Sequence, residues 1–399
     1  MFTAKYIKEG KMLLKGVTKF IHYKRDILSE EKLNAIQEKQ AEFQNRLKTG
    51  TKEEVREQAK ELQKVCERSL PMPSMPGLRE NVEVFFVAIV IALGIRSYFL
   101  QPFKIPTGSM QPTLNGIIAQ GYSDQDEAKW NDAEPNILVK GWDLFWRGRN
   151  YVEVRAKEDF TVSKVYQKNW LKFFSFTYID REDVNGEKLK PIRIWAPVDK
   201  TVKELGLGKL LGEFRASKAT DGSPIFLVNG AEIKAGTLLA RGYIDTGDQV
   251  LVNKLSYHFR NPTRGEVFVF TTQGISLIEE RNGNTNSQHY IKRLVAVPGD
   301  SFEVKQPELY INGSKATEPG IVRVMNQQDG YPGYRRSPKN AGNIGKNSGT
   351  LPPKEYMAMG DNSPNSWDSR GWGTVKEKNL VGPALFVYWP FGAHWGLID

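Results

Sequence analysis

The apolar run from Val84 to Leu100 constrains this chain more than any other stretch of its sequence. Its only charged residue is Arg96, near one end, where a long side chain can carry its charge to the membrane interface. A helix needs about 17–25 apolar residues to span a bilayer. The run therefore predicts one transmembrane helix over residues 83–100, with a buried core helix as the alternative.

The two flanks of this run differ in charge. Lys64, Arg68 and Arg79 precede it within about 20 residues, whereas only Lys104 follows it closely. Because positively charged loops tend to stay in the cytoplasm, the bias places the N-terminus there and everything after the span on the outer face. The proline-rich residues 71–82 are predicted to form a linker before the span.

Composition narrows the choice of ligands. The chain has one cysteine, Cys66, so neither an internal disulfide nor a cysteine-based metal site can form. Its four histidines show no ligand spacing, and we predict no metal and no cofactor. The net charge is +10, yet no helix-turn-helix, zinc-finger or RNP-like pattern is present. Membrane lipid is therefore a better partner for the basic excess than nucleic acid.

The first 70 residues are predicted to be a cytoplasmic basic tail followed by a helical hairpin. Residues 1–25 lack the apolar core of a removable signal peptide, and an amphipathic helix and a solvated tail fit them equally. Apolar residues recur at helical spacing over residues 29–68, and Thr51 with Glu54 forms a capping box for the second helix. We keep self-association or partner binding through this hairpin as a hypothesis.

Residues 117–245 indicate a β-rich insertion of unknown role. Residues 151–155 and 192–195 alternate as strands do, and Asn229-Gly230 between apolar runs predicts a hairpin over 226–233. A short helix is expected over 202–214. Strands dominate after Gly247, and the segments expected to form them are 250–253, 267–270, 290–297, 309–314 with an Asn312-Gly313 turn, and 384–389. Residues 327–350 are expected to form a loop.

A serine is presented directly after the apolar run. Pro102 and Pro106 keep the chain extended, and Gly108 lets the backbone approach a ligand closely. Ser109 is therefore a candidate nucleophile at the foot of a membrane anchor. An ordinary proline-rich linker is the alternative.

A serine nucleophile needs a base within hydrogen-bond reach, and Lys292 is the leading candidate. It lies in a strand of Ile, Leu and Val, where burial can bring a lysine pKa from about 10.4 to about 7–8. Because strand side chains alternate, Lys292 is expected to face inward and Arg293 outward. His258 or His289 with an aspartate is the weaker alternative.

Four ordered blocks resemble type I signal peptidases, the membrane-bound serine proteases that remove signal peptides. The serine block reads Gln101-Pro-Phe-Lys-Ile-Pro-Thr-Gly-Ser-Met-Gln-Pro-Thr-Leu114. The second runs from Gly247-Asp-Gln-Val-Leu-Val-Asn-Lys254 into residues 262–270. The lysine block is Tyr290-Ile-Lys-Arg-Leu-Val-Ala-Val-Pro-Gly-Asp300, and the last is Gly360-Asp-Asn-Ser-Pro-Asn-Ser-Trp-Asp-Ser-Arg370.

The resemblance implies a mainly β catalytic domain made of residues 101–116 and 246–399. It implies a dyad of Ser109 as nucleophile and Lys292 as general base, with the oxyanion held by the Ser109 N–H and the Thr107 hydroxyl. The remaining implied site residues are Ser366, which would hydrogen-bond the lysine amine, and Asp368 and Arg370, which would support it. The family often has arginine after Gly-Asp-Asn, where this chain has Ser363.

The resemblance also implies a substrate and a location. Signal peptides of exported preproteins would be cut after small side chains held in shallow apolar pockets. By proximity and analogy, the candidate lining residues are Phe103, Ile105, Met110, Leu114, Tyr290 and Ile291. The implied location is the bacterial inner (cytoplasmic) membrane, with a single span and the catalytic domain on the periplasmic face. An apolar surface around Phe103 and the Trp-rich loops is expected to contact lipid.

Two other functions stay open at this point. One is a relative on the same fold, such as a self-cleaving peptidase or one specific for pilins or conjugation. Its substrate breadth would separate it from a general signal peptidase. The other is a catalytically silent anchor whose insertion binds envelope partners, which the intact Ser109, Lys292 and Ser366 argue against.

Overall fold

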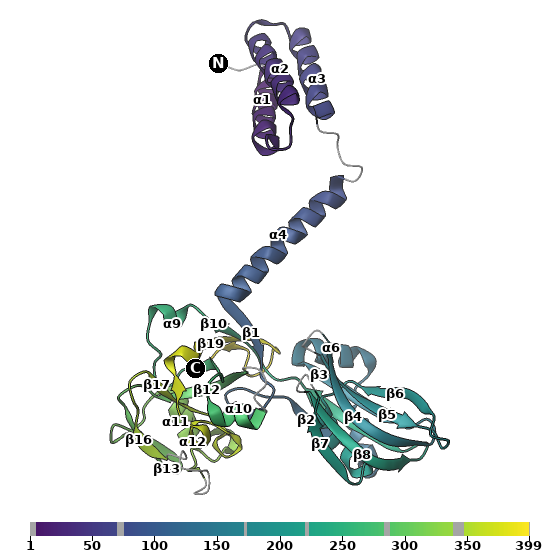
Figure 1. The fold of residues 1–399 in the computed structure, drawn as a ribbon, viewed down its shortest axis with the longest axis vertical. Helices are drawn as coiled ribbons and strands as arrows, with labels where there is room; N and C mark the ends of the chain where they lie inside the picture. The colour runs from purple at the N-terminus through teal and green to yellow at the C-terminus, as the bar shows by residue number, and fades with distance from the viewer. Residues whose placement is uncertain are drawn as a thin grey trace. The chain divides into compact units, whose positions relative to one another are not determined.

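A computed structural model of the chain describes residues 5–69, 76–170, 174–219, 223–282, 288–337 and 347–398. It divides into two units, Met1–Ala92 and Leu93–Asp399. Figure 1 shows that the first unit is helical and that the second is mainly β. The coarse expectation of a mainly β protein with an N-terminal helical region is therefore confirmed.

Within residues 5–69 three helices surround one small core. They are α1 (Lys5–Lys24), α2 (Glu30–Thr49) and α3 (Lys52–Ser69). The hairpin predicted over 29–68 is present as α2 and α3, and the Thr51 N–H donates to the Glu54 carboxylate over 2.9 Å, as a capping box requires. The alternative of a solvated tail over residues 1–25 is wrong for its described part, α1. This helix packs against the hairpin because its apolar residues, such as Val17, repeat at helical spacing.

The helix α4 (Pro76–Tyr98) contains the apolar run. It begins within the predicted 71–82 linker, because proline is well tolerated in the first turn of a helix. Residues 71–75 lie outside the described residues. Among those described, Asn81–Tyr98 is the one window long and apolar enough to cross a membrane, with a mean hydropathy of 1.6. None of the window is buried, so the alternative of a core helix is wrong.

An antiparallel sheet joins residues from both sides of the insertion. Its order is β1-β10-β19-β11-β12-β17-β18, with β20 also paired to β19. Because β1 lies before the insertion and pairs with β10 after it, the two parts fold as one body. The strands are β1 (Leu100–Lys104), β10 (Gln249–Asn253), β11 (Val267–Thr271), β12 (His289–Ala296), β17 (Glu355–Met359), β18 (Val375–Lys376), β19 (Leu380–Trp389) and β20 (Gly396–Leu397).

A smaller sheet of order β15-β14-β13-β16 and several short helices complete this part. The predicted Asn312-Gly313 turn is confirmed: both residues have positive φ, 51° and 80°, and they join β14 to β15. Part of the predicted 327–350 loop, residues 338–346, lies outside the described residues. The elements are β13 (Ser301–Lys305), β14 (Glu308–Ile311), β15 (Ser314–Lys315), β16 (Ser348–Thr350), α9 (Ser256–Phe259), α10 (Ser276–Asn282), α11 (Pro319–Met325) and α12 (Ser369–Trp372).

The insertion is β-rich, as predicted, and has its own core. One sheet has the order β2-β9-β3 and the other β6-β5-β4-β8-β7. The strands are β2 (Ile118–Gly121), β3 (Arg149–Arg155), β4 (Phe160–Trp170), β5 (Phe174–Glu182), β6 (Lys188–Ile194), β7 (Phe214–Lys218), β8 (Pro224–Ile233) and β9 (Leu238–Asp245). The helices are α5 (Glu127–Ala133), α6 (Ile137–Arg147), α7 (Val198–Lys203) and α8 (Leu207–Leu210).

Two local predictions in the insertion are wrong. The Asn229-Gly230 pair makes no hairpin but lies inside β8, where Gly230 takes a φ of +65° at a register shift against β4. Pairing with β4 on both sides of this bulge outweighs the local turn signal. The helix expected over 202–214 is divided into α7 and α8, because Gly206 between them has a φ of +104°.

The segment after β1 runs close against Gly247. A Cβ atom at Gly247 would lie 1.7 Å from the Ile105 carbonyl oxygen. The Ile105 N–H donates to the backbone carbonyl oxygen of Asp248 over 2.8 Å. A glycine is therefore required at 247 to let two backbones meet.

We expect Gly247→Ala to lower the free energy of unfolding by about 1–3 kcal/mol, because the added methyl must displace backbone rather than a flexible side chain. The matched control is Gly141→Ala in α6, where no atom lies within 4 Å of a built Cβ. That change should be neutral or stabilising by up to about 1 kcal/mol. Urea denaturation measures both, and equal effects would contradict the prediction.

Candidate active site

Ser109 lies in a 3₁₀ turn, η1 (Gly108–Met110), and is 8% exposed. The loop after β17 fixes this turn by two hydrogen bonds. The Asn362 N–H donates to the Ser109 carbonyl oxygen over 3.1 Å, and Asn362 Nδ2 donates to the Gly108 carbonyl oxygen over 3.0 Å. Met110 is fully buried on the other side of the turn. The serine is therefore held from two directions.

Lys292 reaches Ser109 from β12. Its Nζ lies 2.7 Å from Ser109 Oγ, and the lysine is only 5% exposed. Burial lowers the pKa of the Lys292 amine to about 8, although Asp368 and Asp361 act in the opposite direction. A lysine with this pKa is still mostly protonated near physiological pH, but a far larger fraction of it is neutral and able to accept a proton than for an ordinary lysine with a pKa of about 10.4.

Arg293 does not face solvent as expected. It is fully buried, with Nε 2.9 Å from Asp361 Oδ1 and Nη2 2.7 Å from Asp361 Oδ2. The prediction failed because both faces of β12 are covered: Ser109 lies over the lysine, and α11 approaches the arginine at Gly320. The Thr113 hydroxyl donates to Asp361 Oδ2 over 2.6 Å, so the ion pair also holds the serine segment.

Asp368 and Arg370 form a second buried pair in the loop after β17. The Asp368 carboxylate accepts from the Gly360 N–H over 3.0 Å and from Arg370 Nη2 over 2.6 Å. Arg370 in turn donates to the Ser363 hydroxyl over 2.6 Å and to the Ser363 carbonyl oxygen over 2.8 Å. The serine at 363 is therefore part of the loop's own network.

Ser366 and Thr107 differ from one another in their surroundings. The Ser366 Oγ is buried and has no hydrogen-bond partner among the described residues, so the expected bond to Lys292 is absent. Lys292 directs its amine to Ser109 instead, and Ser366 Oγ packs against Gly360, where a built Cβ would lie 2.2 Å away. Thr107 is exposed beside η1, and its hydroxyl does not cap that turn.

The residues expected to line substrate pockets divide into three groups. Ile105, Met110 and Leu114 are buried in one core cluster with residues of β10, β11 and β19. Phe103 and Ile291 are partly buried against the same core. Tyr290 belongs to a different cluster, where its ring meets Phe270 edge to face with centroids 6.1 Å apart. The serine segment needs apolar side chains for its own packing, which sequence proximity could not separate from substrate binding.

No histidine hydrogen-bonds Ser109 among the described residues. The His289 ring packs on Phe103, with centroids 5.0 Å apart. His394 pairs instead with Asp248, with Nδ1 2.8 Å from Oδ2. The geometry therefore favours the lysine over a histidine as the partner of Ser109.

The family model described as "Signal peptidase, peptidase S26" matches residues 78–123 and 237–389. Signal peptidase IB of Staphylococcus aureus is 34% identical over 146 residues, which cover 36% of this chain and 70% of the relative. This chain belongs to the S26 family of signal peptidases. It is a type I signal peptidase, and members of that class are serine endopeptidases.

Two further relatives carry the same name. Signal peptidase I of Leptolyngbya laminosa is 27% identical over 195 residues, which cover 49% of this chain and 81% of the relative. A crystal structure of a signal peptidase I from Enterococcus faecalis V583 is 27% identical and covers 31% of this chain and 97% of that chain, with a TM-score of 0.24. The family model does not match residues 124–236, which make up most of the insertion.

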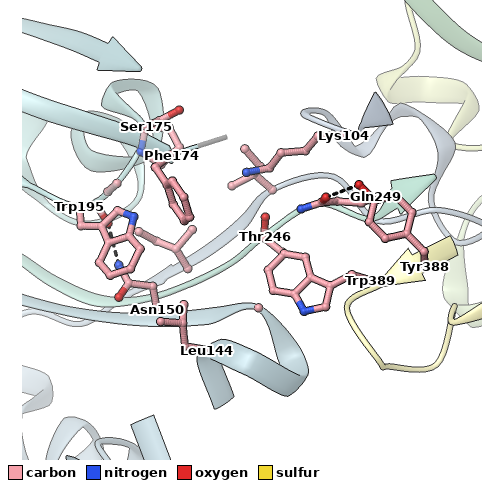
Figure 2. A pocket seen from close by; sticks show the side chains of 15 residues that line it. Lys104, Leu144, Asn150, Phe174, Ser175, Trp195, Thr246, Gln249, Tyr388 and Trp389 are labelled. Carbon is pink, nitrogen blue, oxygen red and sulfur yellow. Dashed lines mark hydrogen bonds between the residues drawn. The ribbon is translucent and has the colours of Figure 1, made fainter. Parts of the chain in front are cut away.

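A cavity of about 380 Å³ lies beside the insertion (Figure 2), and neither Ser109 nor Lys292 is among the residues that line it. Its walls come from β1, β10 and β19 on one side and from the insertion on the other. Burial lowers the pKa of the Lys104 amine at its wall. Sequence reasoning missed this cavity because Lys104, Trp195 and Trp389, which help to line it, are far apart in the chain.

Sequence reasoning also missed Asn362, Thr113 and the pairing of Arg293 with Asp361. Asp361 and Asn362 lie within a conspicuous block of turn-forming residues, which was the available signal. Their partners are far away in sequence, and no spacing rule identifies such partners.

We expect Asp361→Asn to destabilise this signal peptidase by about 3–5 kcal/mol, because it removes the carboxylate charge that pairs with the fully buried guanidinium of Arg293. The control is Glu377→Gln, which breaks an exposed pair with Lys354 at 3.2 Å. Exposed pairs contribute about 0–1 kcal/mol. Guanidinium denaturation compares the two, and a loss below that of the control would refute the buried pair's structural role.

Proposed function

We propose that this protein cleaves signal peptides from exported preproteins with Ser109 as nucleophile and Lys292 as general base. The proposal rests above all on one observation: a buried amine lies 2.7 Å from a buried hydroxyl. That distance permits direct proton transfer, and the lowered pKa leaves the amine able to accept.

The chemistry follows in two stages. The neutral Lys292 amine takes the Ser109 proton while Oγ attacks the carbonyl carbon of the scissile bond. The tetrahedral intermediate then collapses, and the ammonium returns its proton to the leaving amine, which leaves an acyl ester on Ser109. A water molecule activated by Lys292 hydrolyses the ester and regenerates the hydroxyl.

The oxyanion in both stages would be held by the Ser109 N–H and the Thr107 hydroxyl. A single donor of this kind contributes about 2.7–4 kcal/mol in other proteases. The backbone there is firmly placed, because Asn362 holds Gly108 and a Cβ at Gly116 would lie 2.2 Å from the Thr107 carbonyl carbon. Ser366, Asp368 and Arg370 would act by shaping the loop behind Lys292.

The partly buried side chains of Phe103 and Ile291 would contact the substrate, and the buried side chains of Ile105, Met110 and Leu114 would pack beneath them.

The helix α4 would anchor the protein with its N-terminus in the cytoplasm and residues after 100 on the periplasmic face of the inner membrane. The apolar window of α4 and the excess of basic residues before it support this orientation. Preprotein and enzyme would then meet in the plane of the bilayer.

We expect Ser109→Ala and Lys292→Met each to reduce cleavage of a purified preprotein by at least about 10²–10⁴-fold, because each removes one partner of the proton transfer. Lys305→Met is the matched lysine control, since its side chain is 52% exposed on β13. Circular dichroism would check that the variants fold. Processing at the wild-type rate by either dyad variant would overturn the assignment.

We expect kcat/KM for a peptide substrate to rise with pH through about 8 and then level off, because the base must be neutral and burial lowers its pKa to that value. An unburied lysine would shift the rise to about 10.4. Initial rates measured from about two pH units below 8 to about two above it distinguish a base with a pKa near 8 from an ordinary lysine. A rate independent of pH, or one that falls on this limb, would argue against lysine as the base.

A further inference from the structure

The helix α6 of the insertion presents its apolar side to solvent. Ile137 and Leu138 are 83% and 81% exposed, and Trp142, Phe145 and Trp146 are also exposed. At about 100° per residue these five side chains share one side of the helix. In a soluble protein that side would normally face the core.

The opposite side of α6, which faces the protein, is the charged one. Its buried residue is Asp143, whose carboxylate accepts a 2.8 Å hydrogen bond from the Tyr151 hydroxyl. Lys140 forms an ion pair with Glu134 on this side, whereas Arg147 is exposed at the end of the helix, with Nη1 3.6 Å from Asp143 Oδ1. The usual amphipathic arrangement is therefore inverted.

The apolar surface continues beyond α6 onto the chain after β19. The Trp142 and Trp146 rings stack 5.3 Å apart, and Phe391 lies 4.9 Å from Trp146 and 6.1 Å from Trp395. Trp395 and Leu397 are themselves exposed. We call this surface, made of α6 with Phe391 and Trp395, the aromatic patch. An exposed apolar surface of this extent marks an interaction site.

We propose that the aromatic patch lies in the lipid interface of the membrane, as a contact separate from the span α4. Tryptophan and phenylalanine on one face of a short helix are typical of interfacial helices, and Trp favours the headgroup level. The exposed Arg147 at the end of α6 is placed to meet lipid phosphate. Lys and Arg outnumber Asp and Glu in residues 101–399, which favours an anionic bilayer over a second, equally basic copy of this part of the chain.

Hydrogen bonds connect α6 to the sheet that receives the end of the span. Trp389 Nε1 donates to the Phe145 carbonyl oxygen over 2.7 Å, and the Phe391 N–H donates to that of Trp146 over 2.9 Å. Directly after β10 of the same sheet, Lys254 Nζ donates to the Ser97 carbonyl oxygen over 2.7 Å. The residues that follow the span and the residues of α6 are therefore both hydrogen-bonded to one sheet or to the chain directly after its strands.

The test uses spin labels on the full chain in vesicles of phosphatidylethanolamine and phosphatidylglycerol. Cys66→Ser removes the only cysteine, and single cysteines are then introduced by Leu138→Cys, Val184→Cys or Ile89→Cys. Val184, in the turn after β5, is 83% exposed and matches Leu138 in exposure. Ile89 lies within the window of α4 and reports whether the span is inserted.

A label at 138 should collide more often with oxygen, which concentrates in lipid, than with a water-soluble nickel chelate, and a label at 184 should show the reverse. If position 89 reports lipid while 138 behaves like 184, the aromatic patch is in water and the proposal fails, although the anchor stands. If 138 is shielded from both reagents and shows dipolar broadening, a second copy covers the patch, and the proposal also fails.

Discussion

The structure depends on keeping one lysine amine out of water while a hydroxyl lies against it. Burial makes the neutral form of Lys292 accessible, with a pKa of about 8, and the contact with Ser109 gives that form a proton to accept. The same absence of water makes any other charge nearby costly. Arg293 with Asp361 and Arg370 with Asp368 are accordingly buried as bidentate pairs whose hydrogen bonds are also used to shape the site.

These pairs matter because the two groups of the proposed dyad come from distant parts of the chain. Ser109 follows the first strand, and Lys292 lies far beyond the insertion. Thr113 and Asn362 connect the serine segment to the loop after β17, and Asp361 connects that loop to β12. Three segments thus fix one another through polar contacts, while the apolar side chains of Met110 and Leu114 fill the space beneath. A side chain that sequence reasoning assigned to substrate is here part of the support for the nucleophile.

Local rules worked where local contacts decide the structure. Thr51 and Glu54 form their capping box, and Asn312-Gly313 makes its tight turn, because each needs only a few neighbouring residues. The same dipeptide at 229–230 became a bulge, since pairing between β8 and β4 extends past it on both sides. Lys292 and Ser109 could be chosen from their chemistry and order. The burial of Arg293, the partner of Asn362 and the lack of a partner for Ser366 depend on packing between distant segments, which no local pattern encodes.

The insertion begins and ends on neighbouring strands. Ile118 of β2 pairs with Asp245 of β9, so the insertion leaves the main body and rejoins it at neighbouring positions. The insertion packs around its own core, and its length therefore does not separate the proposed nucleophile from the proposed base. Such a module could be exchanged, shortened or enlarged in the course of descent while the hydrolytic centre kept its dimensions. New surface chemistry can therefore evolve on this enzyme without changing how the two groups of the proposed dyad are brought together.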